Sequence, residues 1–371
     1  MLTAELLPTI FIFSQKIFTY KIYMRSMIYS ILIGIVLLCW EEYYMLLNIK
    51  DLSFSQYAPY HYLCVYNMCC RFAIVWKHSD PTAIALFKSI CWSSDSVDLK
   101  TQQNIRKDAN YVDNLFKMQL VSAFLCTVIF HVDFVRLREM SISIFYVSQY
   151  FPHLETAVIF AEITLWIYGS LGMIQCPFML FYYIIHTVYQ LEMFNAYITK
   201  TRSVGYKFSA ESAAFQKLQR KRLIDLIDRQ QEIKRMTVLY LNIFSNSAFF
   251  YTVVAMLTSL AVLFYIFYDD SEHYRAHMLL LISLYTTVMF VVMKYGQRYE
   301  DEFENVFLNL SSEPWYDWNT LNRKIYMTML MKSQKPETVR MGKLADLNCV
   351  FGKNIFQGIF TVANMFNSLQ N

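Results

Sequence analysis

The sequence predicts an all-α membrane protein with seven transmembrane helices. Three observations support this fold class: an apolar composition, apolar segments of membrane-spanning length, and positive charges gathered in alternate loops. Of the 371 residues, 56% are hydrophobic and 17% are charged, whereas about 25% are charged in ordinary soluble domains. Only eight Gly and seven Pro interrupt the chain, so long helices are permitted. This composition is typical of an integral protein of the lipid bilayer with modest loops.

Seven segments are candidates for spanning helices, because a helix needs about 20 mostly apolar residues to cross the bilayer. Six are apolar enough, and the seventh, at the end of the chain, is the most polar. The segments are 27–47, 58–76, 118–136, 159–199, 237–267, 276–296 and 345–369. The fourth is longer than one simple crossing requires, and Gly169, Gly172 and Pro177 within it leave a hairpin open as an alternative.

The distribution of Lys and Arg decides between one crossing and a hairpin. With seven spans, 27 of the 33 basic residues lie in the N-terminal tail and in loops 77–118, 200–236 and 294–343. Basic loops remain in the cytoplasm, and a hairpin would move the ten basic residues of loop 200–236 to the other side. We therefore expect a single fourth span, a cytoplasmic N-terminus and an extracellular C-terminus.

The basic inner segments also have helical patterns. In 211–236, apolar residues recur with a period of about 3.6 residues, at Leu218, Leu223, Leu226, Ile227 and Ile233. No Gly or Pro separates this segment from the fifth span, so one helix is expected to project below the membrane. We accordingly divide the chain into residues 1–293, with six transmembrane helices, and residues 294–371, with a cytoplasmic anchor helix and the last transmembrane helix.

The sequence lacks the patterns of several functional classes. No P-loop, GxSxG or HExxH motif is present, so neither catalytic residues nor an enzyme activity are predicted. The eight Cys show no CxxC spacing, and we expect no zinc site and no cofactor. A net charge of +4 is small for the length and gives no case for nucleic-acid binding.

Topology separates two other functions of seven-helix proteins. A metabotropic receptor coupled to G proteins is the main alternative, but such receptors have an outer N-terminus and usually a DRY-like triplet after the third span. Here the third span ends in HVDFVRLREM (131–140), and the seventh contains no Pro. A transporter is disfavoured because no inverted repeat and no paired broken helices occur.

The segment 295–357 carries an ordered set of residues: Gly296-Gln297, Trp318, Arg323-Lys324, Gln334 to Pro336, Gly342 and Phe351. With its spacing, this set resembles the C-terminal region of insect odorant receptors, and the inverted seven-span layout is similar over the rest of the chain. The chain is shorter before the fifth span than the co-receptor of that family, so it resembles an odorant-tuned subunit. The ending TVANMFNSLQN (361–371) departs from the Ser/Tyr/Phe-rich ending common in the family.

This resemblance implies an odorant-binding subunit of a heteromeric, ligand-gated, non-selective cation channel. Its partners would be co-receptor subunits in a heterotetramer in the plasma membrane of olfactory sensory neurons. The last helix of each subunit would line a central pore. The apolar side of segment 320–332, with Leu321, Ile325, Tyr326 and Met329, is then expected to pack near the tetramer axis.

The last segment carries a polar stripe on one helical face, formed by Asn354, Gln357, Thr361, Asn364 and Ser368. Unpaired amides are costly in hydrocarbon, so the stripe must face protein or water. Hydrogen bonds to neighbouring helices of the same subunit are one interpretation, and a water-filled pore is the other. The resemblance favours a pore lined by Gln357, Thr361, Asn364, Met365 and Ser368, with Met365 and Leu369 at an outer constriction.

Volatile odorants are small and apolar, so their pocket should be concave, aromatic and poor in polar groups. The outer halves of the predicted helices supply such residues: Tyr62, Tyr66, Thr127, Phe130, Phe134, Met173, Pro177, Ile282 and Tyr285. For each aromatic residue taken singly, core packing or an interfacial belt is the simpler interpretation. As a set, they predict a pocket for small volatiles, ring-bearing ones above all, with Thr127 or a tyrosine hydroxyl as the hydrogen-bonding group.

Overall fold

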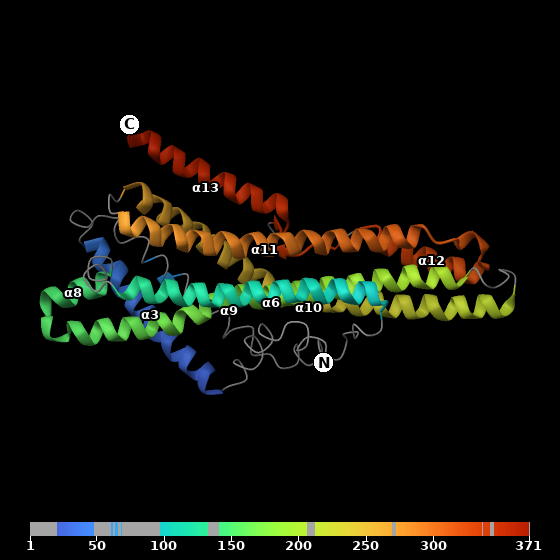
Figure 1. Ribbon diagram of the computed structural model, residues 1–371, viewed down its shortest axis with the longest axis horizontal. Coiled ribbons are helices and arrows are strands. Elements are labelled where there is room, and N and C mark those ends of the chain that lie inside the picture. Colours follow the sequence, from blue (N-terminus) through green and yellow to red (C-terminus); the bar gives the residue numbers. More distant parts are fainter. Residues whose placement is uncertain are drawn as a thin grey trace.

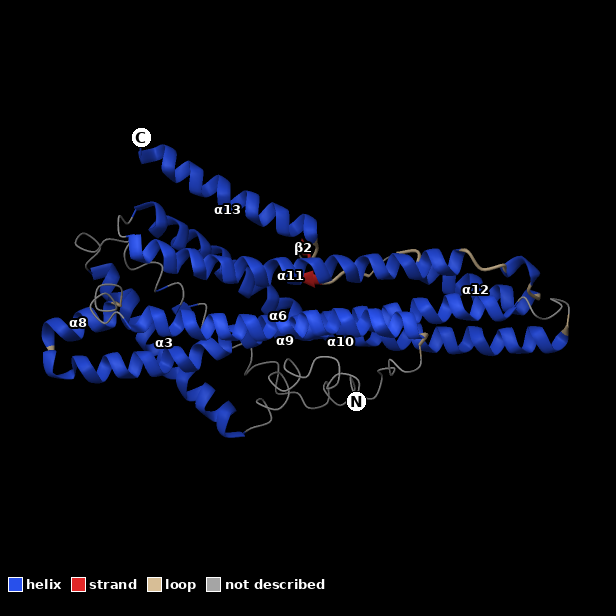
Figure 2. Cartoon of the chain, in the orientation of Figure 1, coloured by secondary structure: helices blue, strands red, loops and turns tan. Residues whose placement is uncertain are grey.

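A computed structural model of the protein describes residues 21–47, 97–132, 141–205, 212–268, 272–335, 337–341 and 345–370, and the single positions 61, 64, 65 and 68. In chain order, the elements are α3 (Lys21–Leu47), α6 (Leu99–Val132), α8 (Ile142–Tyr150), the short helix η3 (Pro152–Leu154), α9 (Glu155–Gly205), α10 (Ala213–Tyr268), α11 (Glu272–Ser311), the short helix η4 (Trp315–Asp317), α12 (Thr320–Ser333), β1 (Arg340–Met341), β2 (Ala345–Asp346) and α13 (Cys349–Gln370). Apart from one small hairpin, the described part is helical, which confirms the all-α prediction (Figure 2).

Three helices are far longer than a bilayer is thick. α9 has 51 residues, α10 has 56 and α11 has 40, which at about 1.5 Å per residue correspond to about 75, 85 and 60 Å. The hydrocarbon core of a bilayer measures only about 30 Å. The three helices pack against one another along the long axis of the molecule (Figure 1).

The fourth predicted segment lies within α9, which is one continuous helix. Gly169, Gly172 and Pro177 therefore form no hairpin, and the preference for a single segment is confirmed. α10 likewise joins the segment 211–236 to the segment that was predicted as the fifth span without a break.

The helical pattern of α10 predicts its buried face correctly for most positions. Leu223, Leu226 and Ile233 are buried, with at most 5% of each residue exposed. Leu218, near the start of α10, is 39% exposed, whereas Phe215 and Gln219 in the same turns are buried, so Leu218 lies on the open side of the helix there.

The best-packed region, which we call the distal bundle, lies away from α8 in Figure 1. It consists of residues 99–116 of α6, 181–200 of α9, 213–237 of α10 and 291–311 of α11, together with α12. Its largest fully buried side chains are those of Phe116, Phe181, Tyr182, Tyr189, Phe194, Arg229, Tyr295, Tyr299 and Tyr326. Aromatic rings thus fill most of this core, and their hydroxyl groups require hydrogen-bond partners there.

α12 is packed into its own chain by the face that was expected at the tetramer axis. Tyr326 is fully buried and Met329 is 2% exposed, and the Tyr326 hydroxyl donates a hydrogen bond to the carbonyl of Leu310. That expectation is therefore wrong for Tyr326 and Met329. Leu321, by contrast, is 47% exposed and remains available to a neighbour.

The turn between α11 and α12 depends on two residues of the odorant-receptor pattern. The Trp318 ring is buried and meets the Tyr326 ring edge-on, with 5.1 Å between the ring centroids. Arg323 donates from Nε to the carbonyl of Trp318 and from Nη2 to the carbonyl of Tyr316, both at 2.6 Å. Arg323 thus satisfies two backbone acceptors that the turn leaves free of helical bonds.

A short hairpin leads into the last helix. β1 and β2 pair antiparallel, with Arg340 opposite Asp346 and Met341 opposite Ala345. The N–H of Leu347 extends the pairing by donating to the carbonyl of Val339 at 2.7 Å. This hairpin was not predicted, because each strand is only two residues long and carries no alternating pattern.

α3 is apolar over most of its length. Its surface exposes Ile28, Leu32, Ile33 and Val36, each to more than 40%. Within the described residues, the Met27–Tyr44 part of α3 is the single stretch of helix long and apolar enough, by length and composition, to cross a membrane.

Candidate functional site

α13 is tied to α11 at its base. Asn348 caps the helix, since its side-chain oxygen accepts a hydrogen bond from the N–H of Phe351 at 3.0 Å. The Cys349 thiol points to the carbonyl of Met293 on α11 at 3.9 Å. From this base, α13 leans away from α11 (Figure 1).

One face of α13 packs against α10 and α11. The side chain of Met293 lies directly over Gly352, and Ile355 and Ala363 are each 8% exposed. Ile359, between them, is half-buried. Spacings of three and four residues place these positions on one side of a helix.

The polar stripe lies on the other side of α13. At about 100° per residue, its centre is roughly opposite the packed face. All its members are exposed: Asn354, Gln357, Thr361, Asn364 and Ser368. The hydroxyls of Thr361 and Ser368 donate to carbonyls of α13 itself, each at 2.8 Å, and in the described part of the chain Gln357 and Asn364 have no side-chain hydrogen bond to another helix. Met365, at the stripe's edge, is 53% exposed.

The residues expected in an odorant pocket fall on several helices. Tyr62, Tyr66 and Phe134 lie outside the described residues. Thr127 and Phe130 belong to α6, Met173 and Pro177 to α9, and Tyr285 to α11, with only their backbone described, and Ile282 on α11 is half-buried. α6, α9 and α11 pack against one another. The helices that carry these residues are therefore neighbours, and the pocket itself stays a prediction.

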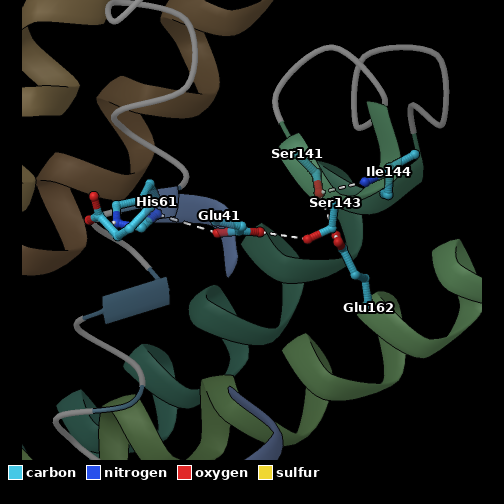
Figure 3. Close-up of polar contacts among 7 residues, drawn as sticks. Glu41, His61, Ser141, Ser143, Ile144 and Glu162 are labelled. Atoms are coloured by element: carbon cyan, nitrogen blue, oxygen red, sulfur yellow. Dashed lines mark hydrogen bonds and ion pairs between the residues drawn. The ribbon is translucent and has the colours of Figure 1, made fainter. Parts of the chain in front are cut away.

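A chain of polar contacts, which was not predicted, joins the helix ends near α8 (Figure 3). One carboxylate oxygen of Glu41 accepts from the Ser143 hydroxyl at 2.6 Å, and the other lies 3.3 Å from Nδ1 of His61. Nε2 of His61 lies 2.7 Å from Glu42. Carboxylates only accept hydrogen bonds, so both contacts of His61 are hydrogen bonds when its ring carries two protons.

The start of α8 supplies a second carboxylate contact in the same region (Figure 3). The Ser141 hydroxyl caps α8 by accepting from the N–H of Ile144 at 3.3 Å, and it donates to Glu162 of α9 at 2.7 Å. Glu41 and Glu162 are 4% and 9% exposed. From the sequence alone, a glutamate within or beside an apolar segment carries no signal for either of these contacts.

Four aromatic rings pack beside Glu41. Trp40 meets Tyr44 at 5.9 Å and Tyr146 at 4.9 Å between ring centroids, and Tyr146 meets Tyr150 at 4.6 Å. These edge and stacked contacts hold α3 against α8. None of the four residues was singled out in the sequence, because aromatic residues are frequent throughout this chain.

The described part of the chain is thus a bundle of long helices whose last helix exposes a polar face. The sequence profile of the family described as 7tm Odorant receptor matches residues 54–355. The chain therefore belongs to the insect odorant receptor family, whose members are ligand-gated cation channels. Members of this family are membrane receptors and channels, not enzymes. Membership therefore does not favour a G-protein-coupled mechanism.

Solved structures agree with this fold. The insect olfactory receptor OR5 from Machilis hrabei in complex with eugenol is similar with a TM-score of 0.72 and 12% sequence identity, over 92% of this chain and 88% of that one. The same receptor without eugenol in its description is similar with a TM-score of 0.68 and 10% identity, over 91% of this chain and 87% of that one. No curated protein matches this chain.

Proposed function

We propose that this chain is the odorant-binding subunit of a heteromeric, non-selective cation channel. Its partners are co-receptor subunits in a heterotetramer in the plasma membrane of olfactory sensory neurons. Seven helices cross the membrane, with the N-terminus in the cytoplasm and the C-terminus outside, and the distal bundle is the cytoplasmic anchor. Residues 1–293 then provide the first six spans and the ligand site, and residues 294–371 provide the anchor helix and the pore helix.

The exposed polar stripe of α13 is the observation that carries this proposal. A stripe used for packing inside one subunit would bond to a neighbouring helix of that subunit. Instead, Ile355 and Ala363 face the chain, whereas Gln357 and Asn364 face away from it. Neutral amides and hydroxyls on a free face can replace the hydration of a passing cation. Gln357, Thr361, Asn364 and Ser368 therefore line the pore, and Met365 borders its narrow outer part.

The ligand class follows from the predicted pocket residues and from a similar protein. A pocket lined by tyrosine, phenylalanine and methionine side chains favours small apolar volatiles. One similar solved structure is a complex with eugenol, which carries an aromatic ring and a hydroxyl. Aromatic volatiles are therefore the first class of ligand to test. The pocket walls are then formed on α6, α9 and α11 by Thr127, Phe130, Met173, Pro177, Ile282 and Tyr285, and elsewhere by Tyr62, Tyr66 and Phe134.

Current recording tests the function directly. The chain is co-expressed with the family co-receptor, and currents are recorded over a panel of aromatic and aliphatic volatiles. Odorant-evoked cation currents that need both chains are the expected result. Currents that depend on added G protein, or none with any partner, would contradict the proposal. An epitope tag after Asn371 should be labelled on intact cells if the C-terminus is outside.

Cysteine substitution tests the pore assignment in the same cells. Cysteines at Gln357, Thr361, Asn364 and Ser368 should react with a water-soluble thiol reagent and reduce the current. Cysteines at Ile355 and Ala363 are matched controls on the packed face, and they should stay unmodified. Unreactive stripe positions with normal currents would show that the polar face binds another subunit.

A further inference from the structure

The segment 293–300 of α11 contacts α6 and α9 on one side and the base of α13 on the other. On one side, Asp108 of α6 accepts three hydrogen bonds. They come from the hydroxyl of Tyr189 on α9 at 3.0 Å, the hydroxyl of Tyr295 on α11 at 2.8 Å, and the guanidinium of Arg298 on α11 at 2.7 Å. All three donors meet the same oxygen, Oδ2, so one atom of Asp108 joins α9 and α11 to α6.

Arg298 extends this network to a second carboxylate. Its other terminal nitrogen pairs with Glu192 of α9, so the planar guanidinium bridges α6 and α9 from α11. Burial alone would lower the pKa of Arg298, but the charges of Glu192 and Asp108 raise it above its ordinary value. Arg298 is therefore charged, and its two terminal nitrogens hold carboxylates of two different helices.

The opposite side of the same segment holds the base of α13. The backbone of Leu347 lies directly against Gly296, where any side chain would overlap its carbonyl oxygen. Asn348, the cap of α13, reaches Glu300 of α11 at 3.5 Å. The segment 293–300 of α11 is thus fixed to α6 and α9 on one side and to the start of α13 on the other.

The geometry points to Arg298, held by Asp108 and Glu192, as the positioning residue that couples odorant binding to the pore helix. This inference rests on the proposed function, in which α13 lines the pore. α6 and α9 run from this network toward the pocket residues predicted on them, Thr127 on α6 and Met173 and Pro177 on α9. A displacement of either helix by a bound odorant changes the ion pairs of Arg298, and this segment of α11 passes that change to Leu347 and α13.

A matched set of variants separates coupling from simple stability. Asp108→Asn keeps the side-chain volume and removes the charge, and Tyr295→Phe removes one hydroxyl from the network. Tyr299→Phe is the control, because the hydroxyl of Tyr299, also buried and one turn further along α11, donates to Thr237 of α10 at 2.9 Å. Each variant is co-expressed with the co-receptor, and surface amount, basal current, odorant EC50 and maximal current are measured.

The expected result is a change in gating at unchanged surface amount. Asp108→Asn and Tyr295→Phe should shift the odorant EC50 or the basal open fraction by about fivefold or more, the lower range of allosteric coupling, while Tyr299→Phe stays within about twofold. Equal gating in all three variants would overturn the inference. If Asp108→Asn does not reach the surface, Tyr295→Phe decides alone, because the loss of one hydroxyl leaves the packing intact.

The outcome also distinguishes this inference from the proposed function. If wild-type channels give no odorant current, or if a cysteine at Asn364 does not react in open channels, the proposed function fails. If wild-type channels respond and Asn364→Cys reacts, but the network variants behave as the Tyr299→Phe control does, only the coupling role of Arg298 fails.

Discussion

The carbonyl oxygen of Leu347 occupies the space that a Cβ atom would need at Gly296. This close approach sets how near the linker before α13 comes to α11. Glycine is therefore required at 296 by contact between two backbones, which cannot move aside as the end of a flexible side chain does. The glycine of the Gly296-Gln297 pair in the odorant-receptor pattern is thus explained here by steric contact with the Leu347 backbone.

Replacing Gly296 by alanine should force Leu347 and the start of α13 away from α11. We expect the surface amount of assembled channel to fall and the unfolding temperature to drop, because overpacking costs about 1–3 kcal/mol or more. Gly358→Ala on α13 is the matched control, since a Cβ at that position would meet no described atom within 4 Å beyond the neighbouring residues and backbone of α13 itself. There, alanine should be neutral or stabilise the helix by up to about 1 kcal/mol. Equal losses in both variants would contradict the steric explanation.

The two sides of α12 should respond differently to substitution. Burial raises the pKa of Tyr326 to about 12, so its hydroxyl stays protonated at physiological pH and donates to Leu310. Met329→Ala should lower the unfolding free energy by about 2–5 kcal/mol. Tyr326→Phe should lower it by only about 0.5–1.5 kcal/mol, because the Leu310 carbonyl loses one donor and keeps the N–H of Glu313.

Leu321→Asp tests the exposed side of α12. It should change the stability of the chain by no more than about 0.5 kcal/mol while lowering assembly with the co-receptor on a native gel. Unchanged assembly would remove the remaining part of the prediction that α12 contributes to the tetramer axis.

The two neighbouring glutamates of α3 should differ sharply in importance. Both contact His61, but the Glu41 side chain is 6% exposed and that of Glu42 is 57% exposed. Glu41→Ala leaves His61 and Ser143 without their buried acceptor, which costs about 3–5 kcal/mol. Glu42→Ala removes an exposed partner, worth about 0–1 kcal/mol. Unfolding temperatures of the two purified variants measure the difference, and similar values would show that Glu41 is not the centre of this cluster.

The length and periodicity of the apolar segments predicted the long helices of the fold. They did not predict which faces of those helices are buried in the same chain, which depends on contacts between helices. α9 and α10 appear as continuous helices because few Gly and Pro interrupt them, and charge placement had already argued against a hairpin. The apolar period of 320–332 predicted a helix, but it could not say whether Tyr326 faces its own chain or a partner. That choice depends on the packing of α12 against α11, which precedes it directly, and against α10, which comes from a distant part of the sequence.

The candidate site was predictable to a similar degree. The stripe of α13 is a local pattern, readable because polar residues at steps of three and four share a face. The Arg298 network is not local, since Asp108, Glu192 and Arg298 come from three helices separated by more than 80 residues in each case. Asp108 and Arg298 are ordinary charged residues in charged segments, and Glu192 is a lone acid in the predicted fourth span, so no spacing rule brings the three together.

The last prediction concerns charge at Asn364, which is exposed on the stripe near the proposed outer constriction. If this position lines a cation pore, Asn364→Asp should raise single-channel conductance and Asn364→Lys should lower it. A unit charge about 4 Å from a permeating cation changes its energy by about 1 kcal/mol in water, equivalent to about a fivefold change in local cation concentration. Mobile ions screen the charge, so smaller effects are expected in concentrated salt.

The same pair of substitutions at Asn110 provides the control. Asn110 is an exposed asparagine of α6 in the distal bundle. A positive or a negative charge at this position should therefore leave the single-channel conductance unchanged. Odorant EC50 should shift by no more than a few-fold with the Asn364 variants, because the predicted pocket lies on other helices. Conductance that is insensitive to the sign of the charge at 364, or equally sensitive at 110, would place Asn364 away from the ion path and leave its stripe as a surface for a neighbouring subunit.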